Sequence, residues 1–163
     1  ESLRARVGLL KGLPESVIEA VQKEITMTDG AQELVETLHA QGHSVALVSG
    51  GFIDIIRPMI NSLSIKYFKA NQLAIVDGFL TGELVGLVID RAAKGAALHE
   101  FASASGVELV NTVAIGDGAN DLDMMAAAGL SIAFNAKPIV VEAADYAINE
   151  KSLRSVAQLM GLK

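Results

Sequence analysis

The chain has 163 residues, of which 51% are hydrophobic and 20% are charged, and it carries a net charge of -6 and no cysteine. This composition excludes a disordered chain, disulfides and thiolate metal sites, and it disfavours nucleic acid or an anionic membrane surface as the main partner. No apolar run approaches the roughly 20 residues that cross a bilayer. We therefore expect a soluble, cytoplasmic protein with one compact core and no membrane partner.

The first part of the chain has the pattern of two short helices, over residues 2–10 and 15–25. Lys11-Gly12-Leu13-Pro14 separates them, and Pro14 suits the first position of the second helix. We interpret these helices as a separate helical subunit. Because the chain begins at Glu1 rather than methionine and enters a helical pattern at once, we expect it to be a piece of a longer chain.

From residue 28 onward the pattern changes to strands alternating with helices. Asp29 is placed to cap a helix that Gly42 ends. Residues 44–48 then predict a buried strand that runs directly into Ser49-Gly50-Gly51. A helix that contains Pro58 follows.

A hairpin or a pair of short strands comes next, over residues 73–76 and 84–89, with turns through Asp77-Gly78 and Thr81-Gly82. A helix over residues 94–104 leads to a second buried strand at 112–115. The remaining elements are a helix at 121–128, a strand at 130–134, a helix from 138, a strand at 146–148 and a helix from 153. This alternation predicts an α/β fold with a Rossmann-like parallel sheet and helices on both faces.

Polar residues gather after the two buried strands, where an open α/β sheet binds its ligands. Ser49-Gly50-Gly51 offers a hydroxyl and glycine N–H groups that can approach a phosphate. The second loop, Gly116 to Asp121, offers two carboxylates and an amide, which suit Mg²⁺. Asp117 is the candidate direct ligand, whereas Asp121 caps the next helix, holds a metal-bound water, or does both.

Lys94 is the third candidate, at the start of a predicted helix and next to Gly95. A lysine at such a position is usually a solvated surface charge. Beside a phosphate site, however, its ammonium group is what a transferring phosphoryl oxygen requires.

The order of these features resembles the haloacid dehalogenase (HAD) superfamily, whose members transfer phosphoryl groups through an aspartyl-phosphate. Within it, the segments ESLRARVGLLKGLP, VSGGF, ANQLAIVDGFLTGELVG, AKGAAL and VAIGDGANDLDMMAAAGLSIAFNAKP are similar to phosphoserine phosphatases. The resemblance covers essentially the whole chain. It implies magnesium-dependent hydrolysis of O-phospho-L-serine to L-serine and phosphate, in L-serine biosynthesis.

The resemblance also implies roles for single residues. It assigns the substrate phosphate to Ser49, Gly50, Lys94 and Asn120, and the magnesium ion to Asp117. The fold that it implies is a HAD-like core over residues 28–163, with residues 1–27 as the remainder of a small helical cap.

Arg6 matches the cap residue that pairs with the substrate carboxylate. A guanidinium binds a carboxylate through two hydrogen bonds and so distinguishes an amino acid from a plain phosphate ester. Without the resemblance, Arg6 is more typical of a charge on the surface of a helix.

The chain departs from the family in its first segment, a strand followed by D-x-D-x-[ST]. The only D-x-D here is Asp121-Leu122-Asp123, which continues into a helical pattern. We therefore expect no catalytic residue in this chain, and we expect the nucleophile and the acid/base aspartate upstream of Glu1. Without that central strand, exposed sheet edges should make an isolated fragment fold poorly or associate.

Other readings stay open at this point. The chain could act on another small phosphoester, or it could be a catalytically inactive phosphate-binding fragment. The oligomeric state, a homodimer included, is also open.

Overall fold

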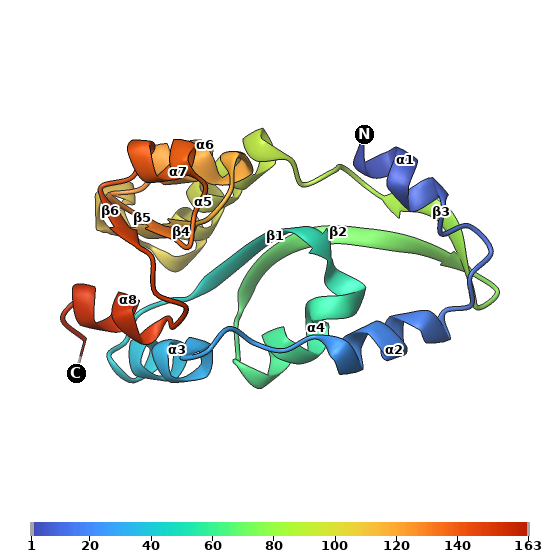
Figure 1. Ribbon diagram of the computed structural model, residues 1–163, viewed down its shortest axis with the longest axis horizontal. Helices are drawn as coiled ribbons and strands as arrows, with labels where there is room; N and C mark the ends of the chain where they lie inside the picture. Colours follow the sequence, from blue (N-terminus) through green and yellow to red (C-terminus); the bar gives the residue numbers. More distant parts are fainter. Residues whose placement is uncertain (1, 163) are drawn as a thin grey trace.

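The strands of the protein form two separate three-stranded sheets (Figure 1), in a computed structural model that describes residues 2–162. In the first sheet, β1 and β2 are parallel and β3 is antiparallel to β2. In the second, β4, β5 and β6 are all parallel. The strands are β1 (Ala46–Phe52), β2 (Tyr67–Val76), β3 (Phe79–Val85), β4 (Val113–Gly116), β5 (Leu130–Phe134) and β6 (Tyr146–Ile148).

Helices connect the strands and follow most of the predicted order. They are α1 (Leu3–Gly8), α2 (Ser16–Glu24), α3 (Ala31–Ala40), α4 (Ile53–Ser62), α5 (Arg91–Ser105), α6 (Leu122–Ala127), α7 (Pro138–Ala143) and α8 (Arg154–Leu159). Short 3-10 helices, Leu109–Asn111 and Ala119–Asp121, precede β4 and α6. No helix among residues 2–162 combines the length and apolar character that crossing a membrane requires.

The hairpin between β2 and β3 confirms the predicted turn. Asp77 and Gly78 have φ values of 51° and 79°, the paired left-handed conformation of a tight hairpin turn. The prediction for the second hairpin strand, residues 84–89, was wrong, because β3 spans Phe79–Val85 and Thr81-Gly82 lies inside this strand rather than in a turn. The strands on either side of α4 were predicted too short. β1 continues through Ser49-Gly50-Gly51 to Phe52, and β2 begins at Tyr67.

The prediction for Asp29 was wrong. The residue that caps α3 is Gly30, whose φ of 77° is left-handed, and no side chain completes the cap. The Asp29 carboxylate instead accepts a hydrogen bond of 2.9 Å from Arg154, which stands at the start of α8 and also pairs with Glu33. This ion pair ties α8 to α3, which lies 121 or more positions away in sequence.

Pro14 does not occupy the first position of α2. It lies just before the helix, forms an isolated bridge to Phe79, and leaves Glu15 as the N-cap.

The faces of the second sheet show why the predicted α/β class is correct. Ile132 and Ala133 are neighbours on β5, and both are fully buried. Because successive strand residues point to opposite faces, Ala133 packs against α6 and α7, and Ile132 packs against α3 and α8. Helices therefore cover both faces of this parallel sheet.

Helices α1 and α2 pack on the β2–β3 hairpin. Val7 and Ile18 share one apolar cluster with Leu73 and Leu80, and Figure 1 shows α1 beside β3. Helices α1 and α2 thus share a core with the hairpin. The division of the chain into a cap remainder at 1–27 and a core at 28–163 stays a prediction.

Gly129 marks a close backbone contact that holds β5 against the segment before β4. A methyl group at this position would lie 2.0 Å from the carbonyl oxygen of Val110, whose main chain would have to move. We expect Gly129→Ala to lower the free energy of unfolding by about 3 kcal/mol, measured by urea denaturation. Gly8→Ala is the control, because a methyl group there meets no atom within 4 Å. Equal stability of both variants would contradict the prediction.

Candidate active site

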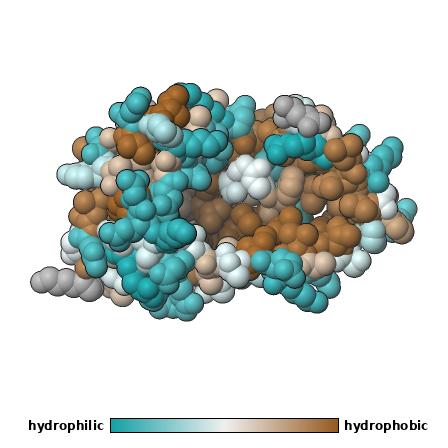
Figure 2. Space-filling view, in the orientation of Figure 1, coloured by the Kyte–Doolittle hydropathy of each residue, from teal (hydrophilic) through white to brown (hydrophobic). Residues whose placement is uncertain are grey.

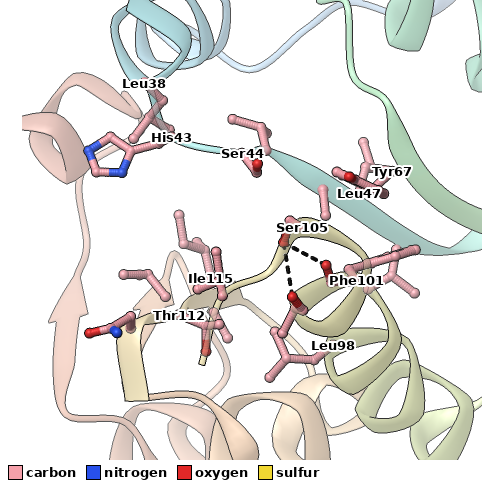
Figure 3. Close-up of a pocket in the computed structure, with 18 of the residues that line it drawn as sticks. Leu38, His43, Ser44, Leu47, Tyr67, Leu98, Phe101, Ser105, Thr112 and Ile115 are labelled. Carbon is pink, nitrogen blue, oxygen red and sulfur yellow. Dashed lines mark hydrogen bonds between the residues drawn. The ribbon is translucent and has the colours of Figure 1, made fainter. Parts of the chain in front are cut away.

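A cavity of about 490 Å³ separates the two sheets, between the open edges of β1 and β4. Each of these strands pairs with one other strand in the described part of the chain. Figure 2 shows the surface hollowed between the parts of the protein that contain the two sheets, with hydrophobic residues at the base of the hollow. In Figure 3, Leu47 of β1 and Ile115 of β4 lie on opposite sides of the cavity, and Leu98 of α5 closes a third side.

Asp121 lies at the wall of this cavity and forms the centre of the polar site. It stands at the N-cap position of α6, yet its side chain makes no hydrogen bond that caps that helix. Its Oδ1 accepts a hydrogen bond of 2.7 Å from Lys94 Nζ, and its Oδ2 accepts the N–H groups of Asp117 and Gly118, both at 3.1 Å. The carboxylate therefore stabilises the conformation of the Gly116–Asp121 loop by binding its main-chain N–H groups.

Lys94 and Asp121 form a buried ion pair, since each side chain is only 7% exposed. Burial alone would raise the pKa of Asp121, but the Lys94 ammonium and the N–H groups of Gly118 and Asp117 outweigh it and lower that pKa below its ordinary value. Asp90 caps α5 by accepting the N–H of Ala93, and this places Lys94 in the first turns of the helix. A buried lysine at this point is not the solvated surface charge that its position in sequence would suggest.

Ser49-Gly50-Gly51, which we call the Ser49 turn, forms the carboxyl end of β1 and lies next to the loop after β4. Ser49 Oγ accepts a hydrogen bond of 2.9 Å from Gly51 N. A methyl group at Gly50 would lie 4.0 Å from Asn120 Nδ2, so the two segments are direct neighbours. The carboxyl ends of β1 and β4 thus bring Ser49, Gly50 and Asn120 together beside the ion pair, as a ligand site in an α/β sheet requires.

Arg6 is exposed on α1, and none of its side-chain contacts reaches the other predicted site residues in the described structure. Its assignment to the substrate carboxylate is thus not supported by a contact here and stays a prediction.

Comparison with known proteins identifies the family. The model of the haloacid dehalogenase-like hydrolases matches residues 1–126. A phosphoserine phosphatase of Streptococcus thermophilus is 45% identical over 160 residues, which are 98% of this chain and 74% of the relative. The chain belongs to the haloacid dehalogenase-like hydrolase family.

The other relatives of this chain are also longer than the chain itself. A phosphoserine phosphatase of Streptomyces coelicolor is 51% identical over 99% of the chain, which spans 40% of the relative's length. A structure of a probable phosphoserine phosphatase from Vibrio cholerae superimposes with a TM-score of 0.94 at 43% identity, covering 98% of this chain and 50% of that one. A phospho-aspartyl intermediate analogue of phosphoserine phosphatase superimposes with a TM-score of 0.91 at 45% identity, covering 99% and 76%.

The described residues of this chain offer part of the oxygen ligand set that a magnesium site would need. Asp117 and Asn120 are exposed and offer oxygen atoms, and magnesium needs only one or two carboxylates because it keeps several waters. Both oxygens of Asp121 are already hydrogen-bonded, which suits a role behind the direct ligands. The described residues contain no group of three or more acidic or histidine side chains that could hold a metal.

Two contacts around the site were not predicted from the sequence. Asn71 on β2 is buried and bonds both the Ser49 turn and the segment before α5. Arg91 Nε donates a hydrogen bond of 2.6 Å to Asp123 and so joins the starts of α5 and α6. Asn71 lies in β2 beside two other polar residues, Lys69 and Gln72, so no local pattern indicated the first contact, and nothing local indicated the second.

Proposed function

We propose that residues 1–163 are part of a phosphoserine phosphatase, which hydrolyses O-phospho-L-serine to L-serine and phosphate. The observation that carries this proposal is the buried Lys94–Asp121 pair beside the Ser49 turn. The similarity to phosphoserine phosphatases over 98–99% of the chain supports the choice of substrate. A cytoplasmic place in L-serine biosynthesis and magnesium dependence are parts of the same proposal.

In this proposal Ser49, Gly50, Lys94 and Asn120 hold the phosphate. Lys94 uses one of its three N–H donors on Asp121, so two donors remain for phosphate oxygens. Because the ammonium is buried, its attraction for a developing negative charge is stronger than it would be in water. The hydrogen bond to Asp121 holds the lysine side chain in one direction.

The nucleophile is proposed to come from a further strand between β1 and β4. Both facing edges are unpaired in the described residues, and the cavity between them reaches Asp121. An aspartate oxygen on that strand bonds to phosphorus while the bond from phosphorus to the serine oxygen breaks, and a second aspartate gives that oxygen a proton. That second aspartate then takes a proton from water, whose oxygen attacks phosphorus and releases phosphate and the first carboxylate.

Asp117 is the residue of this chain that would bind magnesium directly, with Asp121 behind it. The ion supplies positive charge that offsets the charge of the phosphoryl oxygens. Asp117 is held for this by its main chain, because its N–H donates to Asp121 and its carbonyl accepts the N–H of Lys137.

Substitution of Arg6 tests whether the enzyme recognises the amino-acid part of the substrate or only its phosphate. In the complete protein, we expect Arg6→Ala to lower kcat/KM for O-phospho-L-serine by about 10- to 100-fold, because a charged hydrogen-bond donor to the substrate carboxylate is lost. Hydrolysis of an aryl phosphate, which has no such carboxylate, should keep its rate. Both rates are measured as phosphate release.

Arg4→Ala is the matched control, since Arg4 is an exposed arginine on the same helix. It should leave both substrates unaffected. An equal effect of Arg6→Ala on both substrates would refute recognition of phosphoserine and favour another small phosphoester.

A further inference from the structure

Asn71 is a buried polar residue that the proposed chemistry does not use. It lies on β2 and is only 2% exposed. Its side-chain Nδ2 donates a hydrogen bond of 2.8 Å to the carbonyl oxygen of Gly50, and its Oδ1 accepts one of 2.8 Å from Ile89 N. One amide thus bonds two segments that lie 21 and 18 positions away along the chain.

The bond to Gly50 falls where the pairing of β1 with β2 is interrupted. The strands pair residue by residue up to Ser49 and Ala70, and the next pair is Phe52 with Asn71. Gly50 and Gly51 therefore bulge out of the ladder at the point where the phosphate turn is built. The Asn71 amide supplies a donor to a carbonyl in that bulge and so defines its shape.

The bond to Ile89 acts on the other side of the site. Ile89 precedes Asp90, which caps α5 and whose carbonyl accepts the N–H of Lys94. Holding Ile89 in place therefore fixes the beginning of the helix that carries Lys94. A methyl group at Gly50 would lie 3.8 Å from the Ile89 carbonyl oxygen, so these two segments are also in close contact.

We propose that Asn71 is a positioning residue that sets the spacing between the Ser49 turn and Lys94, and thereby the phosphate affinity of the site. The inference rests on the proposed phosphate site but not on the identity of the phosphoester. Both functions of the amide are needed: one donor faces a carbonyl oxygen, and one acceptor faces an N–H group. Asparagine provides this pair on a side chain that is short enough for a strand.

Two variants separate these functions. Asn71→Leu keeps the same branching of side-chain heavy atoms, although leucine is bulkier, and removes both hydrogen bonds. Asn71→Asp keeps an acceptor for Ile89 but places an oxygen opposite the Gly50 carbonyl, where a donor is required. We expect the dissociation constant for inorganic phosphate, measured by calorimetry on the complete protein, to rise about tenfold or more in both, because displaced binding groups no longer meet the phosphate together.

Ser131→Ala is the matched control for loss of a buried polar group. Ser131 is 4% exposed and bonds Asp145 through both its N–H and its hydroxyl, near the end of β5 that faces away from the site. We expect this variant to lower the melting temperature without changing phosphate affinity. Unchanged affinity in Asn71→Asp would overturn the proposal, as would the same loss of affinity in Ser131→Ala. If Asn71→Leu does not fold, Asn71→Asp decides alone.

The outcome for the proposed function is read separately. A wild-type protein that binds phosphate but does not hydrolyse O-phospho-L-serine would refute the proposed function and leave the test of Asn71 valid. A wild-type protein that binds no phosphate would overturn both.

Discussion

Replacement of Lys94 by methionine is expected to lower the free energy of unfolding by about 3–5 kcal/mol, because it leaves the Asp121 carboxylate buried without its cation. The two side chains are each 7% exposed and lie 2.7 Å apart. The expected loss therefore includes the cost of a buried, uncompensated charge. Urea denaturation at neutral pH measures it, and the same variant should lose phosphate affinity.

Two further variants make this result specific. Arg91→Met also removes a cation from α5, but the pair of Arg91 with Asp123 is 53% and 43% exposed, so its loss should cost less than about 1 kcal/mol. The double variant Lys94→Met with Asp121→Asn has no buried carboxylate charge, so part of the lost free energy of unfolding should be recovered. A double variant no more stable than Lys94→Met would show that the buried charge is not the cause.

The isolated 163-residue chain is expected to hydrolyse no O-phospho-L-serine and to self-associate. The open edges of β1 and β4 and the apolar cavity between them are the reason. A peptide with an apolar strand of about five residues followed by Asp-x-Asp-x-Thr should suppress the association and restore magnesium-dependent turnover. Sedimentation and phosphate release measure the two effects.

A control peptide, in which both aspartates are replaced by asparagine, separates the effect of pairing a strand with the open edges from the effect of supplying the catalytic aspartates. It should still suppress association but give no turnover. Turnover by the chain alone that Asp117→Asn abolishes would contradict the prediction, because the nucleophile would then lie within residues 1–163. Phosphate binding without turnover under every condition would favour a phosphate-binding fragment.

Strands and turns were predicted well where a short stretch of sequence specifies them. The strands at residues 130–134 and 146–148 match β5 and β6, and the Asp77-Gly78 turn is where it was expected. Alternation, apolar runs and turn residues act over a few positions, so they can be recognised without the rest of the chain. The cap of α3 was missed because a distant residue, Arg154, binds the carboxylate of Asp29.

The same distinction applies to the site. The residue types of the Gly116–Asp121 loop and of Ser49-Gly50-Gly51 led us to predict phosphate chemistry and magnesium, and the magnesium ion stays a prediction. They did not reveal that Asp121 binds a lysine 27 positions away, since that contact depends on how α5 docks against α6.

The sequence by itself determined the family, the order of strands and helices, and the two loops that carry polar groups, because each depends on short, contiguous segments. Only the tertiary structure decided that Lys94 is buried, that Asn71 joins the phosphate turn to the start of α5, and that the two sheets face each other across an open cavity. These features join residues that are distant in the chain. They therefore follow from the packing of strands and helices, which no local pattern specifies.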